Sequence, residues 1–521
     1  MKASLVGSLL LLLLFPPKGL AQDSLVRINE IKFTSDFEKQ AMVGYLKKSN
    51  RETLLSLLLA TSESITTVKY KEINNRIASI ENKLTSEVAD KKKNDKKIKI
   101  IYDQVHTLFL KKYEIDVRFD DIFLNGKYNC VTATALFALI FDRLNIPYEI
   151  KEEPTHVYLL AYPNANNIIV ETTSPLFGYL SFDDRFKSNY INILKNQKII
   201  GASEIEKKTT EELFNTYYFK NEKIDLQKLV GIHYTNDALF RGDKGDIKGA
   251  FHQMEKGVLL YPASKSQYLL AHFGIETLNK EKLQPKEKAL LISKLSRYKA
   301  QGITNDMIKG EFINLTNELL ARDNNKAAYK DCYAIISKSI TDPELFNEIA
   351  YLYNYENGRI LYNQGNFTSA KSSFEKALSY QPNNIDLQAI FISTIANTFR
   401  NAKRVKPALD SLLLFKKRYP TLEQNSNFNS MLANAYVMQF GEYYQQGDTA
   451  NGEKYKSLFE TMFSTDKNIT VSSNIIGSAY SEACSYYFKR GQRAKAKALV
   501  EKGLEISPDS YELRARQQML H

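Results

Sequence analysis

The clearest hydrophobic pattern in the chain is an apolar run that begins at Cys130. From Val131 to Leu144 nearly every face of a helix would be apolar, which predicts a buried helix of about four turns. Asn129 or Thr132 supplies capping chemistry, and Gly126 allows a sharp approach to the helix. We therefore expect Cys130 in the first helical turn, where exposed N–H groups and the positive end of the helix dipole favour a thiolate.

Three segments after Ile146-Pro147 alternate between apolar and polar side chains, as strands do. They cover residues 148–151, 156–162 and 167–172, and Pro163 to Asn166 reads as a turn between the last two. If Tyr162 faces Asn167 across that turn, His156 faces Thr173. Glu171 then lies diagonally from His156, roughly 7 Å away at the β-carbons.

Helical periodicity precedes this region, in residues 37–46, 54–59 and 98–110. We expect the last of these helices to pack beside the helix that starts at Cys130. Together with the strands, these helices predict an α+β domain over residues 22–225. Residues 190–230 are then a charged, partly helical bridge.

Cys130, His156 and Glu171 form the only chemical constellation that we find in the sequence. A thiol at a helix start, followed by an imidazole and a carboxylate on successive strands, provides what a Cys/His/acid nucleophile needs. A structural alternative is that Cys130 is a small core residue and His156 a satisfied strand residue.

At these residues the sequence resembles the transglutaminase-like superfamily, whose fold is related to papain. Leu144-Asn-Ile-Pro147 matches the turn of that family, His156-Val-Tyr its His strand and Glu171-Thr-Thr173 its acid strand. The resemblance covers about residues 95–190 and implies a catalytic triad of Cys130, His156 and Glu171. The sequence departs from the family pattern in four places: three residues separate Gly126 from Cys130, Glu171 replaces Asp, Thr172 replaces Pro, and Val157 replaces an aromatic residue.

A second signal lies in the C-terminal half. Residues 351–384 place Gly358, Leu361, Ala370, Phe374, Ala377 and Pro382 at the packing positions of a helix-turn-helix repeat of about 34 residues. Residues 477–510 repeat these offsets, and residues 389–422 and 231–264 fit them less tightly. The pattern is that of tetratricopeptide repeats. It predicts an all-α solenoid over residues 226–521, with divergent units in 265–350 and 430–465 and a protein or peptide partner.

The N-terminal sequence indicates where the protein is located. Residues 1–21 carry Lys2, an apolar run and Gly19-Leu-Ala21, which predicts a cleaved signal peptide and an exported chain, periplasmic or secreted.

The cysteines at 130, 332 and 484 do not suggest a disulfide framework, and Cys332 and Cys484 read as buried helix residues. The net charge of +12 is spread out, and the dense run Lys91 to Lys97 reads as a solvated helix start or loop. We expect no nucleic acid, no membrane span, no cofactor and no metal.

Two hypotheses follow. The first is an exported cysteine-dependent amide hydrolase or acyl transferase whose repeats recruit a protein partner. The resemblance leaves open whether it acts as a protease, a deamidase or a crosslinking enzyme. The alternative is a non-catalytic protein in which the transglutaminase-like domain is a scaffold beside protein-binding repeats.

Overall fold

The computed structural model describes residues 25–153, 156–173, 179–180, 200–218, 222–399 and 405–520, with single positions between 184 and 195. The predicted signal peptide, residues 1–21, lies outside the described residues. The chain divides into two compact units, Met1–Thr304 and Asn305–His521, and we describe each by itself.

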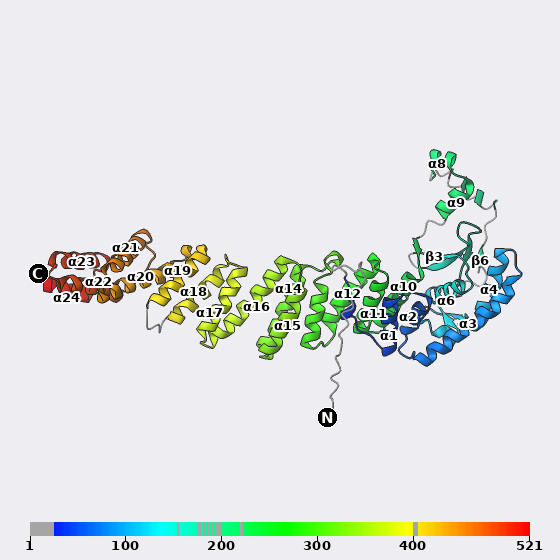
Figure 1. Ribbon diagram of the computed structural model, residues 1–521, viewed down its shortest axis with the longest axis horizontal. Coiled ribbons are helices and arrows are strands. Elements are labelled where there is room, and N and C mark those ends of the chain that lie inside the picture. Colours follow the sequence, from blue (N-terminus) through cyan, green and yellow to red (C-terminus); the bar gives the residue numbers. More distant parts are fainter. Residues whose placement is uncertain are drawn as a thin grey trace, which may run out of the picture. The chain divides into compact units, whose positions relative to one another are not determined.

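The first unit combines helices with two small sheets (Figure 1). Its helices are α1 (Asp36–Lys47), α2 (Arg51–Ala60), α3 (Thr67–Ala89), α4 (Asn94–Leu108), α5 (Asp121–Leu124), α6 (Cys130–Arg143), α8 (Ala202–Lys207), α9 (Thr210–Tyr218), α10 (Leu226–Asp243), α11 (Ile247–Leu260), α12 (Ser264–Lys280) and α13 (Pro285–Leu295). Its strands are β1 (Lys112–Tyr113), β2 (Lys127–Tyr128), β3 (Tyr148–Glu152), β4 (Val157–Ala161), β5 (Ile168–Val170), β6 (Tyr179–Leu180) and β7 (Glu222–Ile224).

The larger sheet has the strand order β6-β5-β4-β3-β7, and every pair in it is antiparallel. Ala161 pairs with Ile168 and Leu159 with Val170, so the predicted register of these two strands is confirmed. The turn between them contains Tyr162, Asn164 and Asn167 at positive φ, a conformation that Asn tolerates better than most residues. The predicted bridge differs from the structure at β7, which pairs with β3 and forms an edge of the sheet.

The predicted buried helix is α6, and it lies against the sheet as Figure 1 shows. Its residues from Val131 to Phe141 are all buried. The rings of Tyr102 in α4 and Phe137 in α6 stack with their centroids 5.6 Å apart, which confirms that α4 packs beside α6. The opposite face of the sheet is apolar too, because Tyr158, Leu160 and Ile169 cluster with Leu213 and Phe214 of α9.

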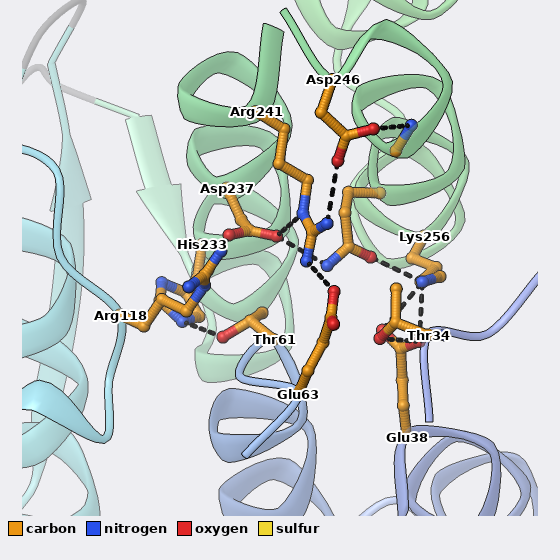
Figure 2. Close-up of polar contacts among 12 residues, drawn as sticks. Thr34, Glu38, Thr61, Glu63, Arg118, His233, Asp237, Arg241, Asp246 and Lys256 are labelled. Atoms are coloured by element: carbon orange, nitrogen blue, oxygen red, sulfur yellow. Dashed lines mark hydrogen bonds and ion pairs between the residues drawn. The ribbon is translucent and has the colours of Figure 1, made fainter. Parts of the chain in front are cut away.

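A buried ionic network joins the N-terminal helices to α10 and α11 (Figure 2). Lys256 Nζ donates to both carboxylate oxygens of Glu38 at 2.8 Å, and both side chains are 0% exposed. Gln253 links this pair to Asp237, donating at 2.6 Å to that carboxylate and accepting from Lys256 at 2.5 Å. Burial alone would raise the pKa of Asp237, but the charges of Arg118 and Arg241 outweigh burial and lower it. The network therefore fixes α10 and α11 within the first unit.

Among its described residues the second unit is built from helices alone, which are drawn from green to red in Figure 1. They are α14 (Asn305–Thr316), α15 (Lys326–Ser339), α16 (Pro343–Asn363), α17 (Phe367–Tyr380), α18 (Ile385–Phe399), α19 (Val405–Arg418), α20 (Ser426–Gln446), α21 (Thr449–Thr465), α22 (Ser473–Phe488), α23 (Arg493–Ile506) and α24 (Tyr511–Leu520). No helix in the described part of the chain is both long enough and apolar enough to cross a membrane.

The predicted repeats coincide with helical pairs. Residues 351–384 lie in α16 and α17, residues 389–422 in α18 and α19, and residues 477–510 in α22 and α23. Within the first of these pairs, Gly358 of α16 lies directly against Phe374 of α17, so close that a β-carbon on Gly358 would be 2.6 Å from the ring. The small and large positions of the repeat pattern therefore meet in space, as expected for helices that pack closely.

The fourth predicted repeat lies in the first compact unit rather than the second. Residues 231–264 cover most of α10 and α11, and α10 buries Leu229, Val230 and Tyr234 in the same core as α6 and β4. The compact units divide between Thr304 and Asn305, whereas the sequence pattern predicts a domain boundary at residue 225. The difference arises because α10 packs on α2 and α6 as well as on α11.

Candidate functional site

Cys130 is the first residue of α6, immediately after the N-cap residue Asn129. The Asn129 side chain accepts a hydrogen bond from the Thr132 N–H, and the Thr132 hydroxyl accepts one from the Asn129 N–H, both at 2.9 Å. Asn129 Nδ2 also donates to the Ile115 carbonyl at 2.9 Å. The helix start is thus fixed from both sides, as the capping prediction requires. Cys130 is partly exposed, in contrast to the buried run that follows it.

The approach to Cys130 depends on Gly126. This glycine has a φ of +75°, and a β-carbon there would lie 2.5 Å from the Lys111 side chain. The chain can therefore turn back so that β2 pairs in parallel with β1 just before the helix begins. This confirms the expected sharp approach and explains why a residue without a side chain is needed at position 126.

His156 and Glu171 lie at the ends of neighbouring strands, His156 just before β4 and Glu171 just after β5. His156 Nε2 is 2.7 Å from Glu171 Oε2, and both side chains are about three-quarters buried. The other carboxylate oxygen of Glu171 accepts from the Thr173 hydroxyl at 2.7 Å and from the Thr173 N–H at 3.1 Å. The carboxylate is therefore held on both oxygens, with one directed to the imidazole.

The electrostatics of the site favour a charged imidazole. Hydrogen bonding with Cys130, followed by hydrogen bonding with Glu171, raises the pKa of His156 to about 10 against the opposing effect of burial. Burial would raise the pKa of Glu171, but the hydrogen bonds from His156 and Thr173 outweigh it and lower that pKa. Because Nε2 binds Glu171, Nδ1 is the ring nitrogen left for the thiol. His156 and Glu171 are thus in direct contact, and Cys130 acts on the pKa of the same imidazole.

Two aromatic side chains of α4, Tyr102 and His106, pack next to the site. The Tyr102 hydroxyl donates to the Glu171 carbonyl at 3.0 Å. The His106 ring packs on Tyr102, with centroids 4.3 Å apart, and burial lowers the pKa of His106 to about 4. His106 is therefore neutral near pH 7 and does not compete with His156 for the role of a charged imidazole.

Tyr113 is a residue of the site that the sequence analysis did not identify. It lies in β1 opposite Tyr128 of β2, and its ring meets the Tyr128 ring edge-on at 5.9 Å. Burial, then the charges of Cys130 and Glu171, raise the pKa of Tyr113, so its hydroxyl lies within electrostatic reach of the site. The side chain is 47% exposed and stays a protonated hydrogen-bond donor near pH 7. A two-residue strand has no detectable periodicity, so only the pairing of β1 with β2 reveals this position.

The other two cysteines differ from Cys130 in their surroundings. Cys332 in α15 and Cys484 in α22 are both buried within helices, as predicted, and neither forms a disulfide. Burial raises the pKa of Cys484. These two thiols therefore serve as internal references for the reactivity of Cys130.

Comparison with known proteins identifies one of the predicted repeats. Residues 351–384 match the family described as Tetratricopeptide repeat, over the same span that the sequence pattern delimits. No curated protein sequence matches the chain. Among solved structures, the crystal structure of the APC/C hetero-tetramer Cut9-Hcn1 contains a similar chain, with a TM-score of 0.20 and 10% identity over 93% of both chains. Because the TM-score is so low, this likeness carries no argument. The assignment of residues 351–384 as a tetratricopeptide repeat rests on the family match and on the pairing of α16 with α17. The chain carries a tetratricopeptide repeat, a structure that binds proteins.

Proposed function

We propose that the chain is an exported, cysteine-dependent amide hydrolase or acyl transferase of transglutaminase-like type, and that its repeats recruit a protein partner. Cys130 is the nucleophile, His156 the proton carrier and Glu171 the residue that orients and stabilises the imidazolium. The observation that carries the proposal is the 2.7 Å contact between His156 and Glu171, together with the partly exposed thiol of Cys130 at the start of α6.

The proposed reaction proceeds in two acyl-transfer steps. Cys130 Sγ attacks the carbonyl carbon of an amide, the S–C bond forms, and the C–N bond breaks as His156 gives its proton to the leaving amine. Water or a second amine then attacks the thioester and returns the acyl group to oxygen or nitrogen, while the thiol recovers its proton through His156. Because Cys130 begins α6, its own N–H is available to the developing oxyanion.

Three products distinguish the reactions that this thioester permits. Incubating the mature protein with casein and a fluorescent primary amine would report crosslinking as fluorescence in casein, while mass spectrometry would report deamidated glutamine or cleaved peptides. We expect one of these products from the wild type and none from Cys130→Ala. A Cys332→Ala variant controls for the loss of a thiol and should retain activity, because Cys332 is buried elsewhere.

Export is part of the proposal and rests on residues 1–21, with their Lys2, apolar run and Gly19-Leu-Ala21. We expect the mature chain to begin at or within a residue or two of Gln22. Mass spectrometry of the protein recovered from the periplasm or medium measures this directly. Retention of Met1 would contradict the export proposal without affecting the triad.

A second candidate function is that of a non-catalytic scaffold beside protein-binding repeats. It is favoured by the family match, which falls on the repeats, and by the departures around Gly126 and at Glu171 from the transglutaminase pattern. Absence of all three products, with unchanged binding of protein partners to Cys130→Ala, would support the scaffold.

A further inference from the structure

The turn between α22 and α23 carries the strongest concentration of positive charge in the described part of the second unit. Its sequence is Lys489-Arg-Gly-Gln-Arg-Ala-Lys-Ala-Lys497, with five basic residues and no acidic one. We call the five residues Lys489, Arg490, Arg493, Lys495 and Lys497 the cationic turn. All five are exposed.

Few carboxylates neutralise this charge. Lys497 approaches Glu501 at 4.0 Å, in a pair whose side chains are both at least half exposed. Glu453, whose pKa Lys495 helps to lower, is already held by Lys456 and by the Tyr444 hydroxyl. Within the chain as described, Lys489, Arg490 and Arg493 form no ion pair. The turn therefore retains most of its charge for an outside partner.

Helix electrostatics account for only two of the four cations nearest the helix ends. Lys489 and Arg490 follow the C-terminus of α22, where the helix dipole stabilises positive charge. Arg493 and Lys495, by contrast, lie in the first turn of α23, where the dipole disfavours positive charge. That turn contains no acidic residue, and its N-cap residue Gln492 makes no side-chain capping hydrogen bond. Arg493 and Lys495 are therefore placed where they weaken the helix, which favours a function in binding.

Aromatic rings hold several of the cations in fixed positions. The Arg490 guanidinium lies 3.7 Å from the centre of the Tyr486 ring, and Arg490 also donates to the Tyr486 carbonyl at 3.2 Å. Lys495 lies 5.2 Å from the Tyr487 ring and Arg493 5.7 Å from the Phe488 ring. A guanidinium that is already stacked loses less freedom when it binds a carboxylate through two parallel hydrogen bonds.

We propose that the cationic turn is a docking surface for an acidic, Asp- or Glu-rich segment of a protein partner. Charge complementarity selects the anionic partner, and the stacked Arg490 suits a carboxylate. Nucleic acid fits less well, because single strands bind by stacking bases on free aromatic faces, and here the rings already carry cations. A protein partner also agrees with the repeat found at residues 351–384.

The test uses the full mature chain and fluorescence anisotropy with a labelled peptide of alternating Glu and Ala. The double variant Arg490→Glu, Lys495→Glu should bind this peptide at least about tenfold more weakly than the wild type. The matched control is Lys376→Glu, Lys467→Glu, which changes the net charge equally at two exposed lysines of the same unit and should bind within about twofold of the wild type. The corresponding Gln-Ala peptide should not bind.

Three outcomes would overturn the proposal. The first is an equal loss of binding in the control variant, which would reduce the effect to overall net charge. The second is no binding of the Glu-Ala peptide to the wild type at low salt, where surface electrostatics are strongest. The third is tighter binding of oligothymidylate or of phosphatidylserine vesicles that depends on Arg490 and Lys495, which would assign the turn to nucleic acid or to a lipid surface.

Discussion

His156 Nε2 lies 2.7 Å from Glu171 Oε2, although the two residues flank different strands. The turn at Pro163 to Asn166 sets the pairing of β4 with β5, and this pairing brings the imidazole to the carboxylate. Glu171 also accepts two hydrogen bonds from Thr173, so its orientation does not depend on His156 alone. The contact provides what a Cys/His/acid mechanism needs from its acid, a fixed and charged imidazole.

The first prediction concerns the titration of His156, whose pKa should be close to 10. Since Cys130 is the largest cause of this shift and Glu171 the next, Cys130→Ala should lower the pKa further than Glu171→Gln. The six histidines can be followed by NMR of chains labelled at the imidazole carbons. Equal titration in all three proteins would show that neither contact acts on His156.

Because of these pKa shifts, the His156–Glu171 pair should contribute to the stability of the fold mainly within a limited range of pH. A raised His156 pKa stabilises the fold fully below the unfolded value of about 6.5, and this contribution is lost as the pH rises through about 10. A lowered Glu171 pKa contributes above about 4.3 and is lost as the pH falls below that value. The destabilisation caused by His156→Ala should therefore be largest between roughly pH 4.5 and 6.5, as urea unfolding at several pH values would show.

Removal of Lys256 should destabilise the first unit strongly. Lys256→Met leaves the Glu38 carboxylate charged and buried without its cation, which costs roughly 3–5 kcal/mol. Adding Glu38→Leu should restore part of the lost stability because the unpaired charge is gone. Lys280→Met provides the control, since the Lys280–Glu276 pair is largely exposed at the lysine and should contribute less than about 1 kcal/mol. Similar effects of Lys256→Met and Lys280→Met in chemical unfolding would refute the structural importance of the network.

Two glycine substitutions in the second unit should change the free energy of unfolding in opposite directions. Gly358→Ala forces a β-carbon against the Phe374 ring and should cost about 1–3 kcal/mol. Gly310→Ala, within α14, meets no atom within 4 Å and should stabilise the helix by roughly 0.5–1 kcal/mol. Thermal unfolding of the two variants measures the difference. A neutral Gly358→Ala would contradict close packing of α16 on α17.

The division into units predicts which fragment folds alone. A fragment of residues 305–521 should be mainly helical by circular dichroism and unfold cooperatively, because its boundaries coincide with a compact unit. A fragment of residues 226–521 exposes Leu229, Val230 and Tyr234 of α10, which the intact chain buries against the N-terminal part of the first unit. It should bind a hydrophobic dye and associate. A monomeric 226–521 fragment without dye binding would instead support a boundary near residue 225.

Local patterns predicted the parts of the fold that local chemistry determines. Asn129 and Thr132 mark the start of α6 by capping, the Pro163 to Asn166 turn sets the β4–β5 register, and the spacing of Gly358 and Phe374 delimits a repeat. Each of these signals lies within one element or between neighbours in sequence. That is why the contact between His156 and Glu171 could be anticipated.

Features that depend on distant packing could not be predicted in this way. The pairing of β7 with β3 joins segments far apart in sequence, and nothing in residues 222–224 identifies their partner. Similarly, α10 has repeat-like offsets, but Arg118, Glu38 and other residues of the N-terminal part hold it and α11 in the first unit. The sequence does not predict the position of Tyr113, because that position is set by the pairing of two strands, β1 and β2, of only two residues each.

The central claim is that His156 activates the thiol of Cys130, and the rate of alkylation at Cys130 tests it most directly. Iodoacetamide labelling near pH 7, followed by peptide mass spectrometry, gives separate rates for Cys130, Cys332 and Cys484 in one chain. We predict that Cys130 reacts fastest, that His156→Ala slows it by at least about tenfold and that Glu171→Gln slows it less, while His272→Ala, at an exposed histidine elsewhere, leaves it unchanged. A Cys130 rate that is unchanged in His156→Ala and no higher than that of the buried thiols would contradict the catalytic account and favour the scaffold.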